Sequence, residues 1–127
     1  RAALANNINA DIFVSIHCNA HKNSAIQGSM TFYYAPTWHS ELSSQRWLRQ
    51  RLALYIQEEM VRYGGRPNLG IKEESFAVLR ETKMPSVLVE TAFMSNSTED
   101  ALLNTDAFRT KIAQGIFKGI EKYFQSL

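Results

Sequence analysis

The chain has 127 residues, of which 45% are hydrophobic and 20% are charged, and its formal net charge is +2 at pH 7. This length and composition suit one domain with its own hydrophobic core and exclude a chain that is disordered throughout. The charge is too small to indicate binding to nucleic acid or to a membrane surface, and the single cysteine, Cys18, excludes an internal disulfide. No run of about 18 apolar residues predicts a membrane span.

The first part of the sequence predicts the end of a helix followed by two strands. Residues 1–9 have a helical pattern without a starting Met or an N-cap, so we expect upstream sequence that this chain does not include. Residues 11–17 form a short, nearly continuous apolar run, which is typical of a strand buried on both faces. Residues 18–27 are polar and predict a loop, and residues 28–34 predict a second strand.

The middle of the sequence predicts the longest helix and a region of little regular structure. Residues 40–63 carry an apolar stripe at helical spacing, and Gly64 and Gly65 end the pattern. Residues 66–75 predict an irregular loop. Residues 76–79 predict a short strand.

The last part of the sequence predicts one more strand and two helices. After a turn at residues 82–85, residues 86–90 form a second apolar run of the buried-strand type. Residues 97–103 predict a short helix with a capping-box start, and residues 106–125 predict a final amphipathic helix. Because strands alternate with helices, the predicted fold class is α/β, with a mostly parallel central sheet flanked by helices on both faces, in one domain over residues 1–127.

Two polar residues close the two strongly apolar strands: His17 ends the first and Glu90 ends the second. In open α/β sheets, ligands bind beyond the carboxyl ends of the strands, so we expect both side chains to face one crevice. Neutral imidazole is a common zinc ligand, and a carboxylate buried at a strand end is costly unless it pairs with a cation or serves as a general base. The alternatives are a histidine hydrogen-bonded to a neighbouring loop and a glutamate held by a salt bridge or a helix N-terminus.

The other histidines and the cysteine do not complete a metal site in the sequence. Catalytic zinc usually has three protein ligands. We expect His21 and His39, which lie in polar segments, to be ordinary surface histidines. Cys18 and His17 are neighbours on a strand, so their side chains point to opposite faces. We therefore interpret Cys18 as a small buried hydrophobe rather than a thiol nucleophile.

Two segments carry a family pattern. In the first, Arg1, Ala5-Asn6 and Ala10-Asp11 lead into Phe13-Val14-Ser15-Ile16-His17-Cys18-Asn19-Ala20. The second contains Val78-Leu79-Arg80, Pro85-Ser86-Val87-Leu88-Val89-Glu90 and Phe93-Met94-Ser95-Asn96. In this order the chain resembles the zinc-dependent N-acetylmuramoyl-L-alanine amidases, and the resemblance covers essentially the whole chain. One departure is Ala92, where the family usually has Gly.

The resemblance implies that the chain is the C-terminal two-thirds of a catalytic domain. That domain would hydrolyse the amide bond between the lactyl group of N-acetylmuramic acid and the L-alanine of the peptidoglycan stem peptide. His17 would be one zinc ligand, and the other two, a His and a Glu, would lie upstream of Arg1. Glu90 would be the catalytic residue. We expect Asn19 and Arg80 to contact the substrate, with a structural ion pair as the alternative for Arg80.

The resemblance also implies where and with what the protein acts. We expect a monomer that acts on peptidoglycan outside the cell, in the wall or periplasm of a bacterium, with no nucleic acid partner and no membrane span. Two other interpretations remain open: a peptidoglycan-binding module without catalysis, and a different zinc hydrolase of the carboxypeptidase type. A His and a Glu upstream would favour the enzyme, and product analysis would separate the amidase from the peptidase.

Overall fold

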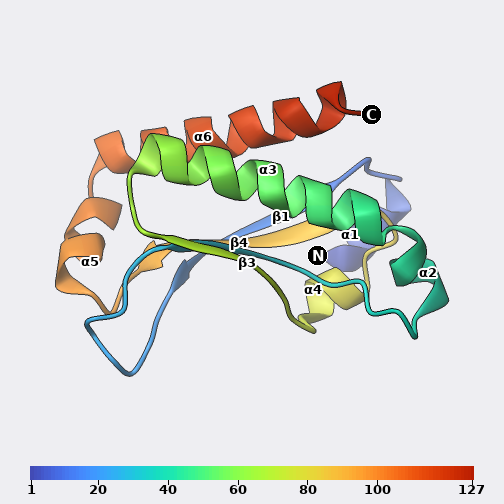
Figure 1. Ribbon diagram of the computed structural model, residues 1–127, viewed down its shortest axis with the longest axis horizontal. Helices are drawn as coiled ribbons and strands as arrows, with labels where there is room; N and C mark the ends of the chain where they lie inside the picture. The colour runs from blue at the N-terminus through green and yellow to red at the C-terminus, as the bar shows by residue number, and fades with distance from the viewer.

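A four-stranded sheet with the strand order β1-β4-β2-β3 forms the centre of the fold, which a computed structural model describes for residues 1–127. Helices lie on either side of this sheet (Figure 1). In chain order the elements are α1 (Ala2–Asn7), β1 (Phe13–Asn19), β2 (Ser29–Tyr33), α2 (Ser40–Ser44), α3 (Arg46–Gly64), β3 (Asn68–Glu73), α4 (Ala77–Arg80), β4 (Ser86–Phe93), α5 (Ser97–Leu103) and α6 (Asp106–Gln125).

The α/β class and the sheet flanked by helices are confirmed, but the sheet is mixed rather than mostly parallel. β1 pairs with β4 in parallel, and so does β2 with β3, whereas β2 and β4 are antiparallel. The loop at residues 20–28 that joins β1 to β2 contains no helix. Parallel strands of one sheet need a crossover of about a dozen residues or more, usually a helix, so this short link returns β2 antiparallel to β1, on the other side of β4.

The two long helices, α3 and α6, lie side by side on one face of the sheet (Figure 1). The main core fills the space between them and that face; its buried members are Tyr33, Leu52, Ala53, Ile56, Met60, Val87, Val89, Ala92, Phe108, Ile112, Ile116 and Tyr123. On the other face, Phe76 before α4 packs edge-on against Phe32 of β2, with ring centroids 5.1 Å apart. None of the helices combines the length and apolar composition that crossing a bilayer requires.

Three predicted elements are wrong or incomplete. The strand predicted at residues 76–79 is the short helix α4, because Leu79 and Arg80 bond back to the carbonyl of Phe76 instead of joining the sheet. The loop predicted at residues 66–75 contains β3, an edge strand rich in polar residues, which pairs only with β2. The helix predicted at residues 40–63 is split at Gln45 into α2 and α3.

A buried arginine, Arg49 of α3, fixes the chain where it enters β4. Its guanidinium donates to the carbonyls of Leu79 at 2.9 Å, Thr82 at 2.9 Å and Met84 at 2.8 Å, and to the hydroxyl of Ser86 at 3.0 Å. Burial lowers the pKa of Arg49 to about 10. With these acceptors, one fully buried side chain satisfies several carbonyls of the α4–β4 connection, which lacks regular ladder bonds.

Two glycines of α6 let its backbone touch the backbone of α3. A Cβ atom on Gly119 would lie 2.5 Å from the Cα of Ile56, and one on Gly115 would lie 2.6 Å from the carbonyl oxygen of Glu59. Real Cβ atoms do not approach backbone so closely, so any larger residue at either position separates the helices.

We therefore expect Gly119→Ala to destabilise the fold. Alanine gains about 1 kcal/mol of helix propensity over glycine, but overpacking against a backbone costs about 1–3 kcal/mol, and here the clash is with atoms that cannot rotate away. Denaturant unfolding measures the net loss. Gln114→Ala, at an exposed position of the same helix, is the control and should change stability little. A Gly119→Ala variant as stable as wild type would show that the helices do not meet at this point.

Candidate functional site

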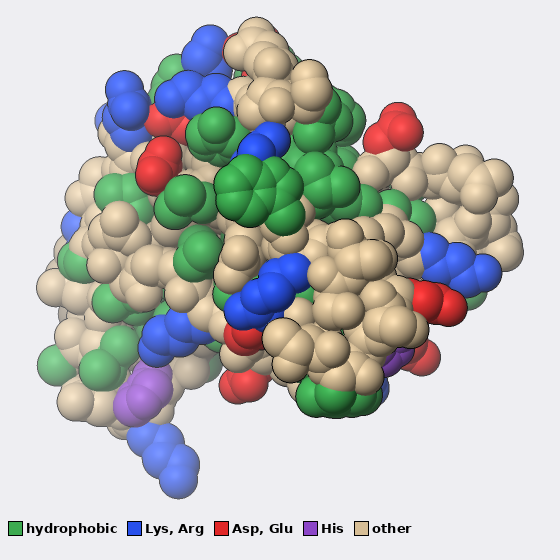
Figure 2. Space-filling model, turned by 45° about the vertical axis from the view of Figure 1, so that its right-hand side comes forward, with side chains coloured by type: hydrophobic (Ala, Val, Ile, Leu, Met, Phe, Trp, Pro, Cys, Tyr) green, Lys and Arg blue, Asp and Glu red, His purple; other side chains and the backbone are tan.

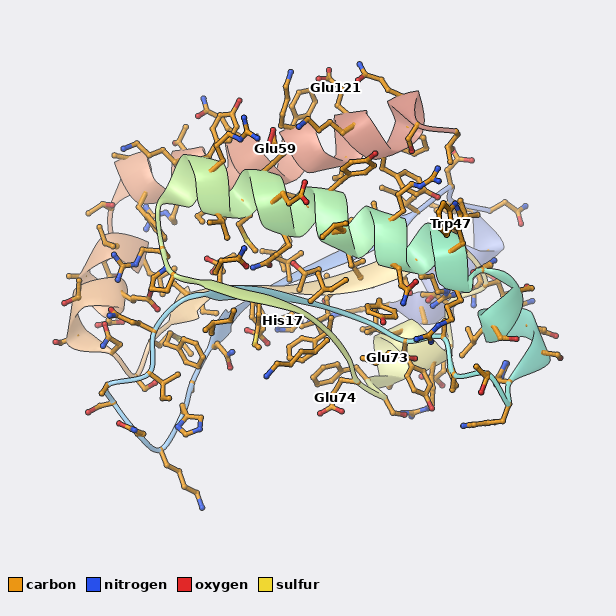
Figure 3. All side chains as sticks on the ribbon, in the orientation of Figure 1. His17, Trp47, Glu59, Glu73, Glu74 and Glu121 are labelled. Carbon is orange, nitrogen blue, oxygen red and sulfur yellow. The ribbon has the colours of Figure 1, made fainter.

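His17 of β1 and Glu90 of β4 are direct neighbours across the sheet, as Cα partners in the parallel ladder. Side chains in register on neighbouring strands point to the same face. That face is the one opposite α3 and α6, because Val87 and Val89, which alternate with Glu90, belong to the core under the helices. Figure 3 shows His17 on this side. The structure thus brings the two predicted site residues together on one face.

Both strands continue past these residues. β1 extends to Asn19 and β4 to Phe93, and the ladder register shifts between His17 and Asn19. Glu90 is also the last residue of β4 that pairs with β2, through Met30. His17 and Glu90 therefore lie just before the register shift between β1 and β4 and where the pairing of β4 with β2 ends, not at the strand ends as predicted.

Glu90 is a carboxylate without enough partners. Its Oε2 atom is buried and makes no hydrogen bond. Burial raises the pKa of Glu90 above its ordinary value. A buried acceptor without a donor destabilises a fold by about 1–3 kcal/mol, more when it is charged. The salt-bridge alternative for Glu90 is wrong, since no cationic side chain of the chain pairs with it.

His17 is bonded through one ring nitrogen. Its Nε2 lies 2.8 Å from the hydroxyl oxygen of Ser15, which is buried and precedes it on the same face of β1. No loop contacts the ring by a hydrogen bond, so the loop-bonded alternative is wrong. The role of Ser15 was missed in the sequence, although strand alternation places it on the same face as His17.

Asn19 lies close to the pair. Its side-chain amide is 3.6 Å from the sulfur of Met30, the residue that pairs with Glu90, and its Oδ1 accepts the backbone N–H of Ala20 at 2.9 Å. The structure therefore brings Asn19 to the same end of the sheet face as His17 and Glu90.

Arg80 is not part of this group. It is exposed on α4, and its Nη1 donates to the carbonyl of Ser75 at 2.7 Å and to the Ser75 hydroxyl at 3.1 Å. It contacts neither His17 nor Glu90 by a hydrogen bond, and it forms no ion pair, so the ion-pair alternative for Arg80 is wrong.

Cys18 is exposed, which corrects the prediction of a buried hydrophobe. With Ile16 and Thr91 it lines an apolar hollow of about 240 Å³ against α5 and α6. The alternation along β1 does place it on the helix side of the sheet, away from His17. It is exposed because β1 is an edge strand, with β4 as its single neighbour.

No three His, Cys, Asp or Glu side chains lie close enough within residues 1–127 to hold a metal ion. The other two histidines serve local structure: Nδ1 of His21 accepts the N–H of Asn23, and Nδ1 of His39 caps α2 by accepting the N–H of Leu42. The chain offers one imidazole and one under-bonded carboxylate side by side. These fit one ligand and one base of a zinc site, but not a whole ligand set.

A fully buried carboxylate, Glu99, holds the end of the sheet where the site lies. Glu99 accepts the backbone N–H of Gly28 at 3.0 Å and that of Phe93 at 2.8 Å, and it pairs with Arg66 at 2.7 Å. It thus bridges the start of β2 and the end of β4 where their ladder stops. The sequence predicted only a capping box. Asn96 does cap α5, but Glu99 reaches into the sheet instead of back to Asn96.

The fold and the site define the class of the protein: an α/β domain that presents an imidazole and a carboxylate from neighbouring parallel strands. The sequence profile of a family described as N-acetylmuramoyl-L-alanine amidase, Amidase_3, matches residues 1–122. N-acetylmuramoyl-L-alanine amidase LytC of Bacillus subtilis is 39% identical over 116 residues, which are 91% of this chain and 22% of LytC. The endolysin of Bacillus phage SPP1 is 38% identical over 120 residues, 94% of this chain and 42% of the endolysin.

Solved structures show the same likeness. N-acetylmuramoyl-L-alanine amidase from Clostridium difficile 630 matches with a TM-score of 0.87 at 34% identity, covering 98% of this chain and 63% of that one. The catalytic domain of CwlV from Bacillus (Paenibacillus) polymyxa var. colistinus matches with a TM-score of 0.85 at 33% identity and the same coverage. The chain therefore belongs to the N-acetylmuramoyl-L-alanine amidase family. It spans less than two thirds of the length of each of these relatives.

The raised pKa of Glu90 predicts a pH dependence of stability. The pKa of Glu90 is higher in the folded state than in the unfolded state. The folded state therefore loses stability as pH rises through the folded-state pKa. Below about pH 4 the carboxyl is protonated in both states, so this loss is absent. We expect the stability of Glu90→Gln relative to wild type to rise from acid to neutral pH. Denaturant unfolding across this range measures it, with the exposed Glu58→Gln as the control. A flat difference would mean that Glu90 is not strained by burial.

Proposed function

We propose that this chain is the part of a peptidoglycan amidase that carries His17 and Glu90. The enzyme hydrolyses the amide bond between the lactyl group of N-acetylmuramic acid and the L-alanine of the stem peptide. The observation that carries the proposal is the in-register pair of His17 and Glu90, with one buried carboxylate oxygen left unbonded, in a chain of the amidase family.

Glu90 acts as the general base and then as the general acid. It accepts a proton from the attacking water, whose oxygen bonds to the amide carbon, and it returns the proton to the nitrogen of L-alanine as the C–N bond breaks. A base works best when its pKa lies near the operating pH, and burial moves the pKa of Glu90 in that direction. The unbonded Oε2 is available for this proton because no group of the chain occupies it.

His17 is the zinc ligand that this chain supplies. The remaining ligands, a His and a Glu, are provided by sequence that precedes Arg1. A bound zinc ion lowers the pKa of its water to about 7 and polarises the carbonyl. Support comes from the position of His17 next to Glu90 and from the greater length of the solved relatives.

Asn19 and Arg80 bind the substrate. Asn19 lies beside Met30 at the end of the site face, where its amide can reach a peptide group of the stem. Arg80 uses one guanidinium nitrogen for Ser75, which leaves further donors for a carboxylate of the stem peptide.

The protein works as a monomer on peptidoglycan outside the cytoplasm, in the wall or periplasm of a bacterium. A relative from Staphylococcus epidermidis, 31% identical over 120 residues, is named a probable cell wall amidase.

We expect the 127-residue chain to bind zinc only weakly, because a single imidazole beside one carboxylate does not make a catalytic ligand set. Calorimetric titration with zinc measures the affinity, and His17→Ala is the matched variant. Tight stoichiometric binding that survives in His17→Ala would refute His17 as the ligand and point to other groups, such as His21.

In the full-length protein we expect Glu90→Gln to retain zinc and to lose activity on purified peptidoglycan by about 10²–10⁴-fold, since the amide cannot accept the proton. Mass spectrometry of the products shows which bond is cut: stem peptides that begin with free L-alanine identify an amidase. Glu58→Gln, at an exposed position of α3, is the control for the loss of one negative charge. Cleavage within the stem would indicate the carboxypeptidase type, and retention on peptidoglycan without products would indicate the binding module.

A further inference from the structure

Both tryptophans of the chain are exposed, so neither serves the core. Trp47 on α3 is 69% exposed and Trp38, before α2, is 75% exposed. An exposed indole is a large apolar surface that water disfavours; a single exposed apolar side chain is ordinary, but one that borders an apolar hollow marks a candidate binding surface. Trp47 borders a hollow on α3. Figure 3 shows it on α3, across the sheet from His17.

The hollow beside Trp47 is apolar with a polar rim. It has a volume of about 420 Å³ and is lined by Trp47, Gln50, Arg51, Leu54, Tyr55 and Ile71. Five of these residues belong to α3, and Ile71 comes from the edge strand β3. The α3 residues are three or four positions apart, so they form one stripe of the helix. Ligand pockets for small molecules start at about 300 Å³, so the hollow can hold a sugar residue. In Figure 2 hydrophobic side chains gather on the forward face with Lys and Arg side chains beside them.

The indole is held in place before any ligand arrives. The Arg51 guanidinium lies over one face of the Trp47 ring, 4.7 Å from its centroid. Arg51 is itself anchored, because its Nη1 donates to the Ser126 carbonyl at 3.1 Å and to the Ser126 hydroxyl at 3.3 Å, at the end of α6. A fixed aromatic side chain loses little conformational entropy on binding, which favours affinity.

The charge of the hollow also limits what it can hold. Arg51 forms no ion pair with a carboxylate of the chain, so its positive charge and its remaining N–H donors are available at the rim. The amide oxygen of Gln50 is free as an acceptor, since Gln50 uses its nitrogen for the Tyr33 hydroxyl. A flat apolar platform flanked by planar hydrogen-bonding groups matches a pyranose ring, whose C–H face stacks on indole while its hydroxyl and amide groups bond at the edge.

We propose that this hollow, the Trp47 hollow, is a second binding site for the glycan strand of peptidoglycan. Its ligand is an N-acetylated hexosamine residue stacked on the free face of Trp47, with Arg51 bonding a ring substituent or a nearby carboxylate. The identity of the polymer rests on the proposed function, but the recognition of an amino sugar does not need catalysis. The site lies across the sheet from His17, so it holds the wall while the site face remains free.

The test compares variants of Trp47 with matched variants of Trp38. In the Trp38→Phe variant, Trp47 is the single indole, and we expect its fluorescence to shift on titration with a β-linked N-acetylglucosamine oligomer. Trp47→Ala should weaken retention on purified, zinc-free peptidoglycan by about tenfold or more, whereas Trp38→Ala should not. Both side chains are exposed, so circular dichroism should confirm that all variants fold.

The outcomes separate the two proposals. An unchanged Trp47 fluorescence with equal retention of both alanine variants would overturn the Trp47 hollow, whatever the activity of the enzyme. A sugar-dependent shift in a protein that releases no stem peptides would support the hollow while the amidase proposal fails. A dimer at sedimentation equilibrium that Trp47→Ala dissociates would assign the hollow to a second copy of the chain and overturn the glycan proposal.

Discussion

The parallel register between β1 and β4 is the constraint on which the candidate site depends. It places His17 directly beside Glu90, and the alternation of side chains sends both to the face that the long helices leave free. A slip of one residue in either strand would turn one of the two side chains into the core beneath α3 and α6. The apolar neighbours Val87 and Val89 oppose this one-residue slip, because it would move them out of the core under the helices.

Two buried charges of opposite sign hold β4 at its ends. Arg49 donates hydrogen bonds to the carbonyls of the connection that enters β4. Glu99 accepts hydrogen bonds from backbone N–H groups where β4 leaves the sheet. Both side chains are fully bonded, and Arg66 pairs with Glu99. Between them Glu90 keeps an oxygen without a partner. Well-satisfied groups at both ends offset the destabilising group in the middle, as expected when a site is kept under-bonded for function.

The sequence predicted the elements whose pattern is local and strong. The apolar runs of β1 and β4 and the amphipathic stripe of α6 each follow from spacing alone, and with them the face shared by His17 and Glu90. The rest depends on partners that lie far away in the sequence. β3 is polar because it lies at an edge of the sheet, β2 is antiparallel because its link is short, and Cys18 is exposed on β1, which pairs with β4 alone among the four strands. The contact of Ser15 with His17 and the missing partner of Glu90 likewise arise only in the folded chain.

We propose different roles for the two faces of the domain. The site face carries short side-chain contacts and an under-bonded acid, which suits chemistry on one bond at a time. The Trp47 hollow carries a rigid apolar platform, and the Arg51 guanidinium beside it forms no ion pair. These features suit the binding of a polymer without catalysis. Because α3 also presents Arg49 to the entry of β4, one helix joins the gripping surface to the strand that bears Glu90. Where one polymer contacts both faces at once, weak contacts on each face add to a longer stay on the wall.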